Sequence, residues 1–339
     1  MKQNAARLFS LRTLAAIGFI VFLVGSPAGE ISAGEAAPKK DIRVRVSIPS
    51  ISFAQLPLQA GAQLGVFRAE GLDVSTEELK PTASIAGLIN GEIQFMTGGS
   101  SAMRAAASGA PVKLLTGGSE KPAFYLVSQP GIEKVADLKG KIVAVTSLTS
   151  LTDVITRDVL KQHGLSPEKD VQIMALGSTA NILAGLTSKQ VQGGILSPPF
   201  DSLARKSGLR VLLFAGDFVQ ALQGGMASSN QQIAANPEMI KRFIRGYIRS
   251  IQFTQSNKDK VVPVISKIFN LDPDSASQAY DSVKGIWRAD GGVSKQVLQK
   301  EIDAWKATTK TARDVSLNDL VDFSFLRQAQ QELGVKPLD

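Results

Sequence analysis

The chain has 339 residues, no cysteine and a single histidine, and its formal net charge is +8. The missing cysteines exclude disulfides, thiolate metal sites, cysteine nucleophiles and a lipid-modified N-terminal cysteine. The basic residues are scattered among few aromatic side chains, which is not the pattern of a nucleic-acid-binding surface, so we expect no nucleic-acid partner.

The first residues have the pattern of a secretory signal peptide. Lys2, Arg7 and Arg12 precede an apolar run over residues 14–25, and small residues follow as far as Ala33. A membrane span needs about 20 apolar residues, so this run is too short and predicts a cleaved signal over residues 1–33. An uncleaved membrane anchor is the alternative. We expect a secreted, soluble, periplasmic protein that is not lipid-anchored.

Two similar units follow along the chain. Residues 42–48 (IRVRVSI) alternate as a strand does, a helix is predicted over 55–67, and residues 71–74 return as a second strand. This is a βαβ unit. The same order recurs about a hundred residues later, as a strand at 141–146, a helix at 152–163 and a strand at 170–176.

The segments after these units can be aligned as well. GLINGEIQ at 87–94 and GLTSKQVQ at 185–192 share their first two residues and their last. So short a match could arise by chance, but its place after matching βαβ units favours two lobes of like construction. From Asn236 onward only helices are predicted, including one that ends at Gly334, a usual C-cap. We therefore predict two α/β lobes and a helical tail.

The most informative stretch is AVTSLTSLTD at 144–153. A serine nucleophile there needs a nearby base, but His163 lies at the far end of the following helix, about 18 Å away. The chain also lacks the glycine-rich phosphate loops and the calcium-binding loop. We therefore expect no enzymatic activity, no catalytic residue, no metal and no cofactor.

A binding role fits this stretch better. Ser150 stands at the N-cap of the predicted helix and Asp153 at its N3 position. The free N–H groups of a helix start favour a negative group, and Thr146, Ser147 and Thr149 could add hydroxyl donors. Helix capping without any ligand is the alternative.

Comparable loops occur at PSISF (49–53), TGGSSAM (97–103) and SPPF (197–200). In open α/β sheets, ligands bind beyond the carboxyl ends of strands, where these loops are expected. Core packing is the alternative for Phe53 and Phe200. The candidate ligand-binding residues are Ser50, Ile51, Ser52, Phe53, Gly98, Gly99, Ser100, Ser101, Thr146, Ser147, Leu148, Thr149, Ser150, Pro199 and Phe200.

GVFRAEGLDV at 65–74 resembles a signature of substrate-binding proteins for ABC importers of the nitrate, sulfonate and taurine class, which share a fold with proteins that bind the thiamine pyrimidine precursor. The resemblance extends over most of the chain, through SGAPVKLLTGGS (108–119), DLKGKIVAV (137–145), GGILSPPF (193–200) and NPEMIKRFIRGYI (236–248). It implies the type II periplasmic binding protein fold, with two α/β lobes joined by a two-strand hinge and a ligand cleft between them.

The resemblance also implies the domain boundaries and the partners. Lobe 1 would comprise residues 40–123 plus 225–339, and lobe 2 residues 124–224. The expected function is capture of a small organic solute, of the anionic sulfonate or carboxylate type, for an ABC transporter permease in the inner membrane, by a monomeric protein. An exported enzyme on the same fold and a ligand sensor without transport are the alternatives.

Overall fold

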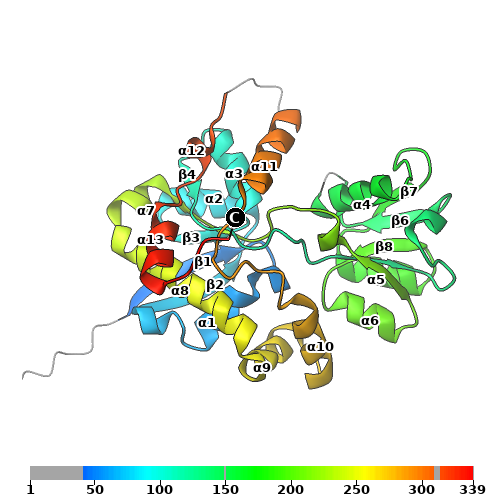
Figure 1. Cartoon of the computed structure of the whole chain (residues 1–339), viewed down its shortest axis with the longest axis horizontal. Coiled ribbons are helices and arrows are strands. Elements are labelled where there is room, and N and C mark those ends of the chain that lie inside the picture. The colour runs from blue at the N-terminus through cyan, green and yellow to red at the C-terminus, as the bar shows by residue number, and fades with distance from the viewer. Residues whose placement is uncertain (1–40, 149, 309–313, 339) are drawn as a thin grey trace, which may run out of the picture. The chain divides into compact units, whose positions relative to one another are not determined.

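Two five-stranded sheets organise the protein in a computed structural model that describes residues 41–148, 150–308 and 314–338 (Figure 1). The predicted signal segment and Thr149 lie outside these residues. Within them, no helix is long and apolar enough to cross a membrane. Residues 40–339 group as one unit by their contacts.

The first sheet has the strand order β2-β1-β3-β10-β4. Its strands β1, β2 and β3 are parallel, and β10 runs antiparallel to both of its neighbours. The bounds are β1 Ile42–Ile48, β2 Leu72–Glu78, β3 Phe95–Thr97, β4 Val112–Leu114 and β10 Met226–Ser229.

The second sheet repeats this arrangement in the order β7-β6-β8-β5-β9, with β5 antiparallel to both neighbours. Its bounds are β5 Tyr125–Ser128, β6 Ile142–Val145, β7 Gln172–Ala175, β8 Gly193–Leu196 and β9 Arg210–Phe214. Each sheet therefore has a parallel βαβ unit on one side and one strand contributed after a crossover.

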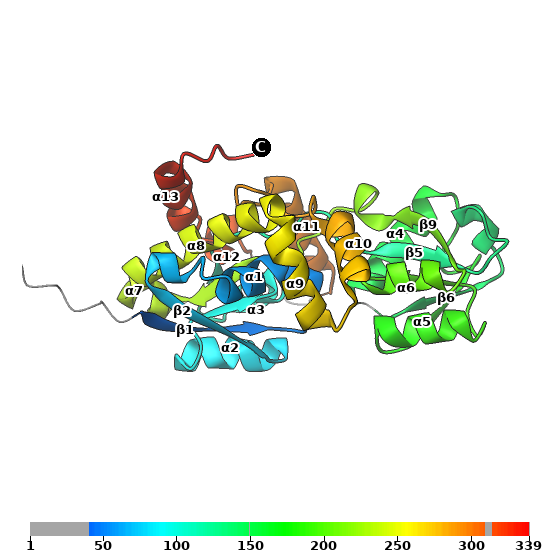
Figure 2. The ribbon, with the colours of Figure 1, turned by 90° about the horizontal axis from the view of Figure 1, so that it is seen from below.

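Helices cover both faces of each sheet (Figures 1 and 2). Around the first sheet, α2 lies on one side and α1 and α8 on the other; around the second, α4 and α5 lie on opposite sides. The bounds are α1 Leu56–Gln63, α2 Pro81–Asn90, α3 Gly99–Ala107, α4 Leu151–Gln162, α5 Thr179–Thr187, α6 Phe200–Lys206, α7 Asn230–Ala235, α8 Pro237–Ser256, α9 Lys258–Phe269, α10 Pro273–Val283, α11 Lys295–Thr308, α12 Leu317–Leu320 and α13 Ser324–Leu333.

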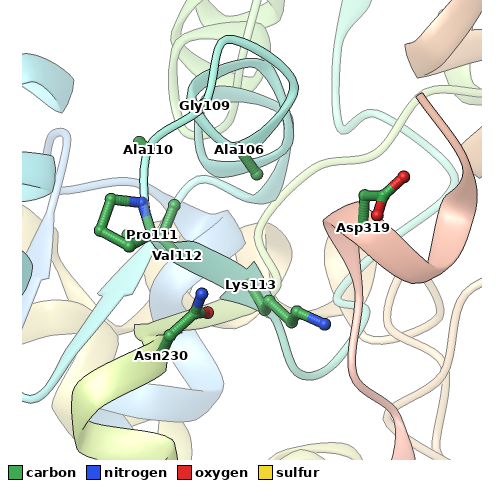
Figure 3. Close-up of a pocket in the computed structure, with 8 residues that line it drawn as sticks. All are labelled: Ala106, Gly109, Ala110, Pro111, Val112, Lys113, Asn230 and Asp319. Carbon is green, nitrogen blue, oxygen red and sulfur yellow. The ribbon is translucent and has the colours of Figure 1, made fainter. Parts of the chain in front are cut away.

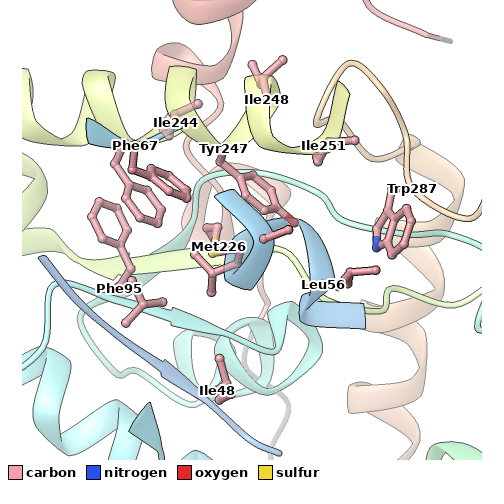
Figure 4. Packing of buried hydrophobic residues seen from close by; sticks show 14 of the residues in the cluster. Ile48, Leu56, Phe67, Phe95, Met226, Ile244, Tyr247, Ile248, Ile251 and Trp287 are labelled. Atoms are coloured by element: carbon pink, nitrogen blue, oxygen red, sulfur yellow. The ribbon is translucent and has the colours of Figure 1, made fainter. Parts of the chain in front are cut away.

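The largest core lies between the first sheet and the helices α1 and α8 (Figure 4). The Phe243 ring stacks on Phe95, with ring centroids 3.7 Å apart, and on Phe67, with centroids 5.3 Å apart. The tail helices complete this core, because α8, α10 and α13 contribute buried residues to it. The tail therefore packs on the first sheet.

The predicted repeat between residues 87–94 and 185–192 has a structural basis. Both segments close an α-helix and lead into the third parallel strand, and the N–H of Ile93 donates to Gly87 at 3.3 Å as that of Val191 does to Gly185. A Cβ on Gly87 would lie 3.3 Å from Ile93, and one on Gly185 would lie 3.5 Å from Val191. In both halves the shared glycine lets the helix pack closely on the residue that leads into the next strand.

The sequence placed most elements correctly but differed at some ends. The helix expected over 55–67 ends at Gln63, because Gly65 adopts a left-handed φ of +78°. Helix α9 was not predicted from the sequence and carries Pro263 inside it. The helix predicted to end at Gly334 begins at Ser324, and the separate short helix α12 before it was not predicted from the sequence.

Candidate functional site

The hydroxyl side chains after β6 form one hydrogen-bonded network centred on Thr152. Its Oγ1 lies 2.8 Å from the Oγ1 of Thr146 and 2.8 Å from the Oγ of Ser150, and it accepts the Thr146 N–H at 3.0 Å. The side chain of Ser150 accepts the N–H of Asp153, which confirms the predicted N-cap. Thr152 is buried and was not among the predicted site residues, although it stands within the stretch that drew attention.

The rest of this loop is open to solvent. Ser147 is exposed, and its carbonyl accepts the Ser150 hydroxyl at 2.6 Å. The Leu148 side chain is 55% exposed. The network therefore fixes the backbone of the loop, while Ser147 and Leu148 remain exposed to solvent.

The loop after β1 divides into an exposed and a buried part. Ser50 is exposed and Ile51 is 47% exposed, whereas Ser52 is half-buried and donates its hydroxyl to the Gln55 side chain. The Phe53 ring is buried and stacks on Phe269 at a centroid distance of 4.2 Å. Phe53 is thus part of the core, and its ring face is already covered in this conformation.

The glycine turn after β3 packs on the chain that returns to the first sheet. Gly98 has a left-handed φ of +94°, and the Gly99 N–H donates to the Gly224 carbonyl at 2.6 Å. A Cβ on Gly99 would lie 2.8 Å from the Leu222 side chain. The Ser100 hydroxyl lies 3.0 Å from the Leu222 carbonyl and 2.8 Å from the Glu301 carboxylate, and Ser101 is half-buried. Tight packing at Gly99 explains why glycine is needed there.

In the SPPF loop, Pro199 is buried and Phe200 is half-buried against the core of the second sheet. Asp201, directly after this loop, was not among the site residues predicted from the sequence. It is 2% exposed, and its Oδ1 atom has no hydrogen-bond partner within the described part of the chain. Burial raises the pKa of Asp201, although backbone N–H donors act in the opposite direction. No sequence signal distinguishes such a buried carboxyl from an ordinary helix-start aspartate.

Three segments run side by side where the chain crosses between the sheets. Ser119, between β4 and β5, forms antiparallel bridges to Gln223, between β9 and β10, and to Trp287 in the tail. A Cβ on Gly118 would lie 2.5 Å from the Gly225 nitrogen, so the close approach requires glycine. The resemblance implied two connecting strands, and the structure adds a third segment from the tail.

A partly buried charge cluster joins the tail segment to the first crossover. The Arg288 guanidinium donates to Glu120 at 3.0 Å and to the two Asp290 oxygens at 3.2 and 3.1 Å. Glu120 also accepts the backbone N–H of Ser294 at 2.5 Å. Burial raises the pKa of Asp290, but donors from Arg288, Leu338 and Gly292 outweigh it, so that the pKa lies below its ordinary value.

The histidine lies where the sequence placed it. His163 is the C-cap of α4, its Nδ1 lies 2.8 Å from the Val159 carbonyl, and its ring contacts Phe218 at 5.1 Å. It therefore stands at the opposite end of α4 from the hydroxyl network. Over the described ranges, no group of three acidic or histidine side chains could hold a metal ion.

A surface pocket of about 290 Å³ lies at the other end of α3 from the glycine turn (Figure 3). Its lining residues are Ala106, Gly109, Ala110, Pro111, Val112, Lys113, Asn230 and Asp319. Lys113 donates to the Asn318 carbonyl at 3.0 Å and Asp319 caps α12, so both charges are already engaged. The pocket contains none of the predicted site residues.

Curated relatives of this chain are binding proteins. It is 27% identical over 270 residues to the riboflavin-binding protein RibY of Chloroflexus aurantiacus, a match that covers 76% of this chain and 71% of RibY. It is 25% identical over 245 residues to a putative binding protein of Brucella abortus, covering 66% of this chain and 76% of the relative.

Solved structures show the same fold. The periplasmic aliphatic sulphonate binding protein SsuA of Escherichia coli superposes with a TM-score of 0.67 at 19% identity, over 82% of this chain and 91% of SsuA. DSZB, solved with biphenyl-2-sulfinic acid, superposes with a TM-score of 0.64 at 13% identity, over 86% of this chain and 99% of DSZB. The chain thus has the periplasmic binding protein fold. Residues 53–261 match the NMT1/THI5-like family, and because this match spans more than half of the sequence, the chain belongs to that family.

Proposed function

We propose that this protein captures a small organic solute and delivers it to the permease of an ABC importer in the inner membrane. The curated relatives named above are binding proteins, which supports the binding role. We further propose that it acts as a periplasmic monomer without a lipid anchor, with lobe 1 over residues 40–123 plus 225–339 and lobe 2 over 124–224. When solute binds, the two lobes would close about the crossovers, and the permease would recognise the closed, loaded form.

One observation carries the proposal: in each sheet, the first parallel strand is followed at its carboxyl end by a loop that bears hydroxyl side chains. Ser50 and Ile51 lie exposed after β1, and Ser147 and Leu148 lie exposed after β6. Ligands of open α/β sheets bind at this edge. The hydroxyls and the N–H groups at the start of α4 can donate to a sulfonate or carboxylate oxygen.

An enzyme on the same fold is the second reading. A hydrolytic serine needs a base, and His163 is separated from the hydroxyl network by the length of α4. Asp201 is the one observation that favours it, because a buried carboxyl with a raised pKa is the usual form of a general acid. It lies in the second half of the molecule, beside the SPPF loop.

The test is a thermal-shift screen of the purified protein against alkyl and aryl sulfonates, nitrate, bicarbonate, aromatic acids, pyrimidines and riboflavin. A solute at 100 times its dissociation constant stabilises the fold by about 2.7 kcal/mol, or about 5 °C for a chain of this size. Each hit is then incubated for hours and analysed for chemical change. A shift with the solute unchanged supports the binding protein, and turnover that disappears in Asp201→Asn supports the enzyme.

A further inference from the structure

Helix α10 belongs to the core of the first sheet, yet it also contacts the unit built on the second sheet. Its buried side chains Ala276, Ala279, Tyr280 and Val283 lie in the core that α1 and α8 form with the first sheet. Helix α6, in contrast, packs on the second sheet through Ala204. Two hydrogen bonds nevertheless join α10 to α6 and to β5, outside the crossover segments.

The first of these contacts lies at the start of α10. The Lys206 ammonium, at the end of α6, donates to the Ser275 hydroxyl at 2.6 Å and lies 3.8 Å from the Asp272 carboxylate. The Ser275 hydroxyl in turn donates to Asp272 at 2.6 Å, and Asp272 accepts the Ser275 N–H at 2.9 Å as the N-cap of α10. The acceptor side is therefore built within α10 and its cap, and Lys206 reaches it from the second sheet's unit.

The second contact lies in the last turn of α10, close to the crossovers. The Tyr125 hydroxyl, at the start of β5, donates to the Ser282 carbonyl at 3.2 Å. Tyr125 follows the first crossover closely, and Ser282 shortly precedes the tail segment at Trp287. At 1.5 Å per residue, about 10 Å of helix separates Ser282 from Ser275. The Lys206 contact is therefore the one that lies further from the crossovers along α10.

A rotation of the two proposed lobes about the crossovers would act unequally on these contacts. A rigid-body rotation of about 15°, the size of some protein switches, displaces a point by about 3 Å more when it lies about 10 Å further from the axis. Hydrogen bonds between heavy atoms weaken beyond about 3.2 Å. A change in lobe arrangement therefore breaks the Lys206 contact before the Tyr125 contact.

The conformation that contains the Lys206 contact is one in which the proposed ligand loops are open. Ser50 and Ile51 after β1, and Ser147 and Leu148 after β6, are exposed to solvent. Ligand pockets bury about 70–90% of a small ligand's surface, so enclosing a solute would cover these loops. The Lys206 contact therefore belongs to the open arrangement.

We propose that Lys206, Ser275 and Asp272 form a latch that stabilises the open arrangement of the two proposed lobes and breaks when a solute is enclosed. The inference rests on the proposed function, since a protein that captures no solute has no closure for the latch to oppose. Closure must overcome the free energy that favours the open state, so the latch lowers the apparent affinity for solute. Lys206 and Asp272 are half-exposed, and such ion pairs are weak, so the latch changes the affinity by a small factor.

The experiment is isothermal titration calorimetry of the purified protein with riboflavin, p-toluenesulfonate, methanesulfonate and nitrate as probes. Lys206→Ala removes the ammonium group, and Asp272→Asn removes the charge but keeps an oxygen that can cap α10. The matched control is Lys258→Ala, because Lys258 on α9 pairs with Asp281 on α10 at 2.5 Å, with similar exposure but within the core unit of the first sheet. We expect each latch variant to bind a probe about 3-fold more tightly than wild type, and the control to bind it unchanged.

The latch can also be locked chemically, because the chain has no cysteine. In the variant Lys206→Cys with Asp274→Cys, both thiols stand at exposed positions and a short bismaleimide can join them. The same protein capped with N-ethylmaleimide is the control. The locked protein should bind a probe at least about 10-fold more weakly than the capped protein, because α6 and α10 can no longer separate.

Three results would overturn the latch while leaving the proposed function intact. The first is a probe that binds wild type but binds Lys206→Ala with equal or lower affinity. The second is an equal gain of affinity in Lys258→Ala, and the third is equal affinity of the locked and the capped protein. If neither these four probes nor any solute of the thermal-shift panel binds, the binding role and the latch are contradicted together.

Discussion

Gly91 and Lys189 occupy the same position in the two halves of the molecule, and both have a left-handed backbone. Gly91 is the C-cap of α2 with a φ of +77°, and Lys189 follows the end of α5 with a φ of +62°. Each N–H returns to the last helical turn, donating to Leu88 and Leu186 respectively. One half thus uses glycine where the other places a side chain in a conformation that L-residues rarely adopt.

Lys189→Gly should therefore stabilise the protein by about 0.5–1 kcal/mol, the relief of left-handed strain less the added entropy of the unfolded chain. The converse change, Gly91→Lys, should destabilise it by about 1 kcal/mol. Both effects can be measured by urea unfolding. Equal stability of all three proteins would mean that the left-handed position carries no strain in this fold.

Gly117→Ala should destabilise the protein by more than about 3 kcal/mol, because its Cβ would overlap the carbonyl group of Gly292 at the crossover. Gly285→Ala is the control: its Cβ would meet nothing within 4 Å, so the change should stay within about 0.5 kcal/mol. Thermal unfolding checks both. A wild-type melting temperature for Gly117→Ala would contradict the close approach of the tail to the crossover.

The Thr152 hydroxyl should matter to the site although it is buried. Thr152→Val keeps the shape of the side chain but leaves the Thr146 N–H without its acceptor, which should cost about 1–3 kcal/mol of stability. It should also weaken solute binding, because the exposed loop loses its anchor. Thr152→Ser retains the hydroxyl and should bind as wild type does. Calorimetry of the three proteins with one identified solute checks the expectation; identical affinity would reduce the network to helix capping.

Acid should weaken the tail's attachment to the crossover through Asp290. Since the pKa of this carboxyl lies below its ordinary value of 3.8 in the folded protein, the folded state binds the proton less readily than the unfolded chain. The resulting stability is present above the ordinary value and is lost as the pH falls through the folded pKa. Asp290→Asn should therefore be less stable at pH 7 and lose less stability between pH 5 and about 3. Chemical unfolding across this range measures it, and parallel curves for variant and wild type would exclude Asp290 as a contributor.

Much of the architecture followed from local patterns. The alternation in IRVRVSI predicts a half-buried strand, and β1 occupies those residues. Ser150 with Asp153 predicts a helix start, and α4 begins directly after Ser150. Capping and periodicity depend on neighbours a few residues apart, so a single sequence contains them. The family resemblance, carried by short motifs in the right order, likewise required no coordinates.

Contacts between distant residues were decided only by the tertiary structure. Phe53 and Leu148 both appear in the sequence as apolar residues of a loop, yet one is stacked on Phe269 and the other is exposed. Pairing of Glu120 with Arg288 brings together a crossover and the tail, which are 168 residues apart in the sequence. The sequence by itself thus determined the strands, caps and family. Which loop residues remain open to a solute depended on packing between segments far apart in the chain, where burial is set by the partner and not by the residue.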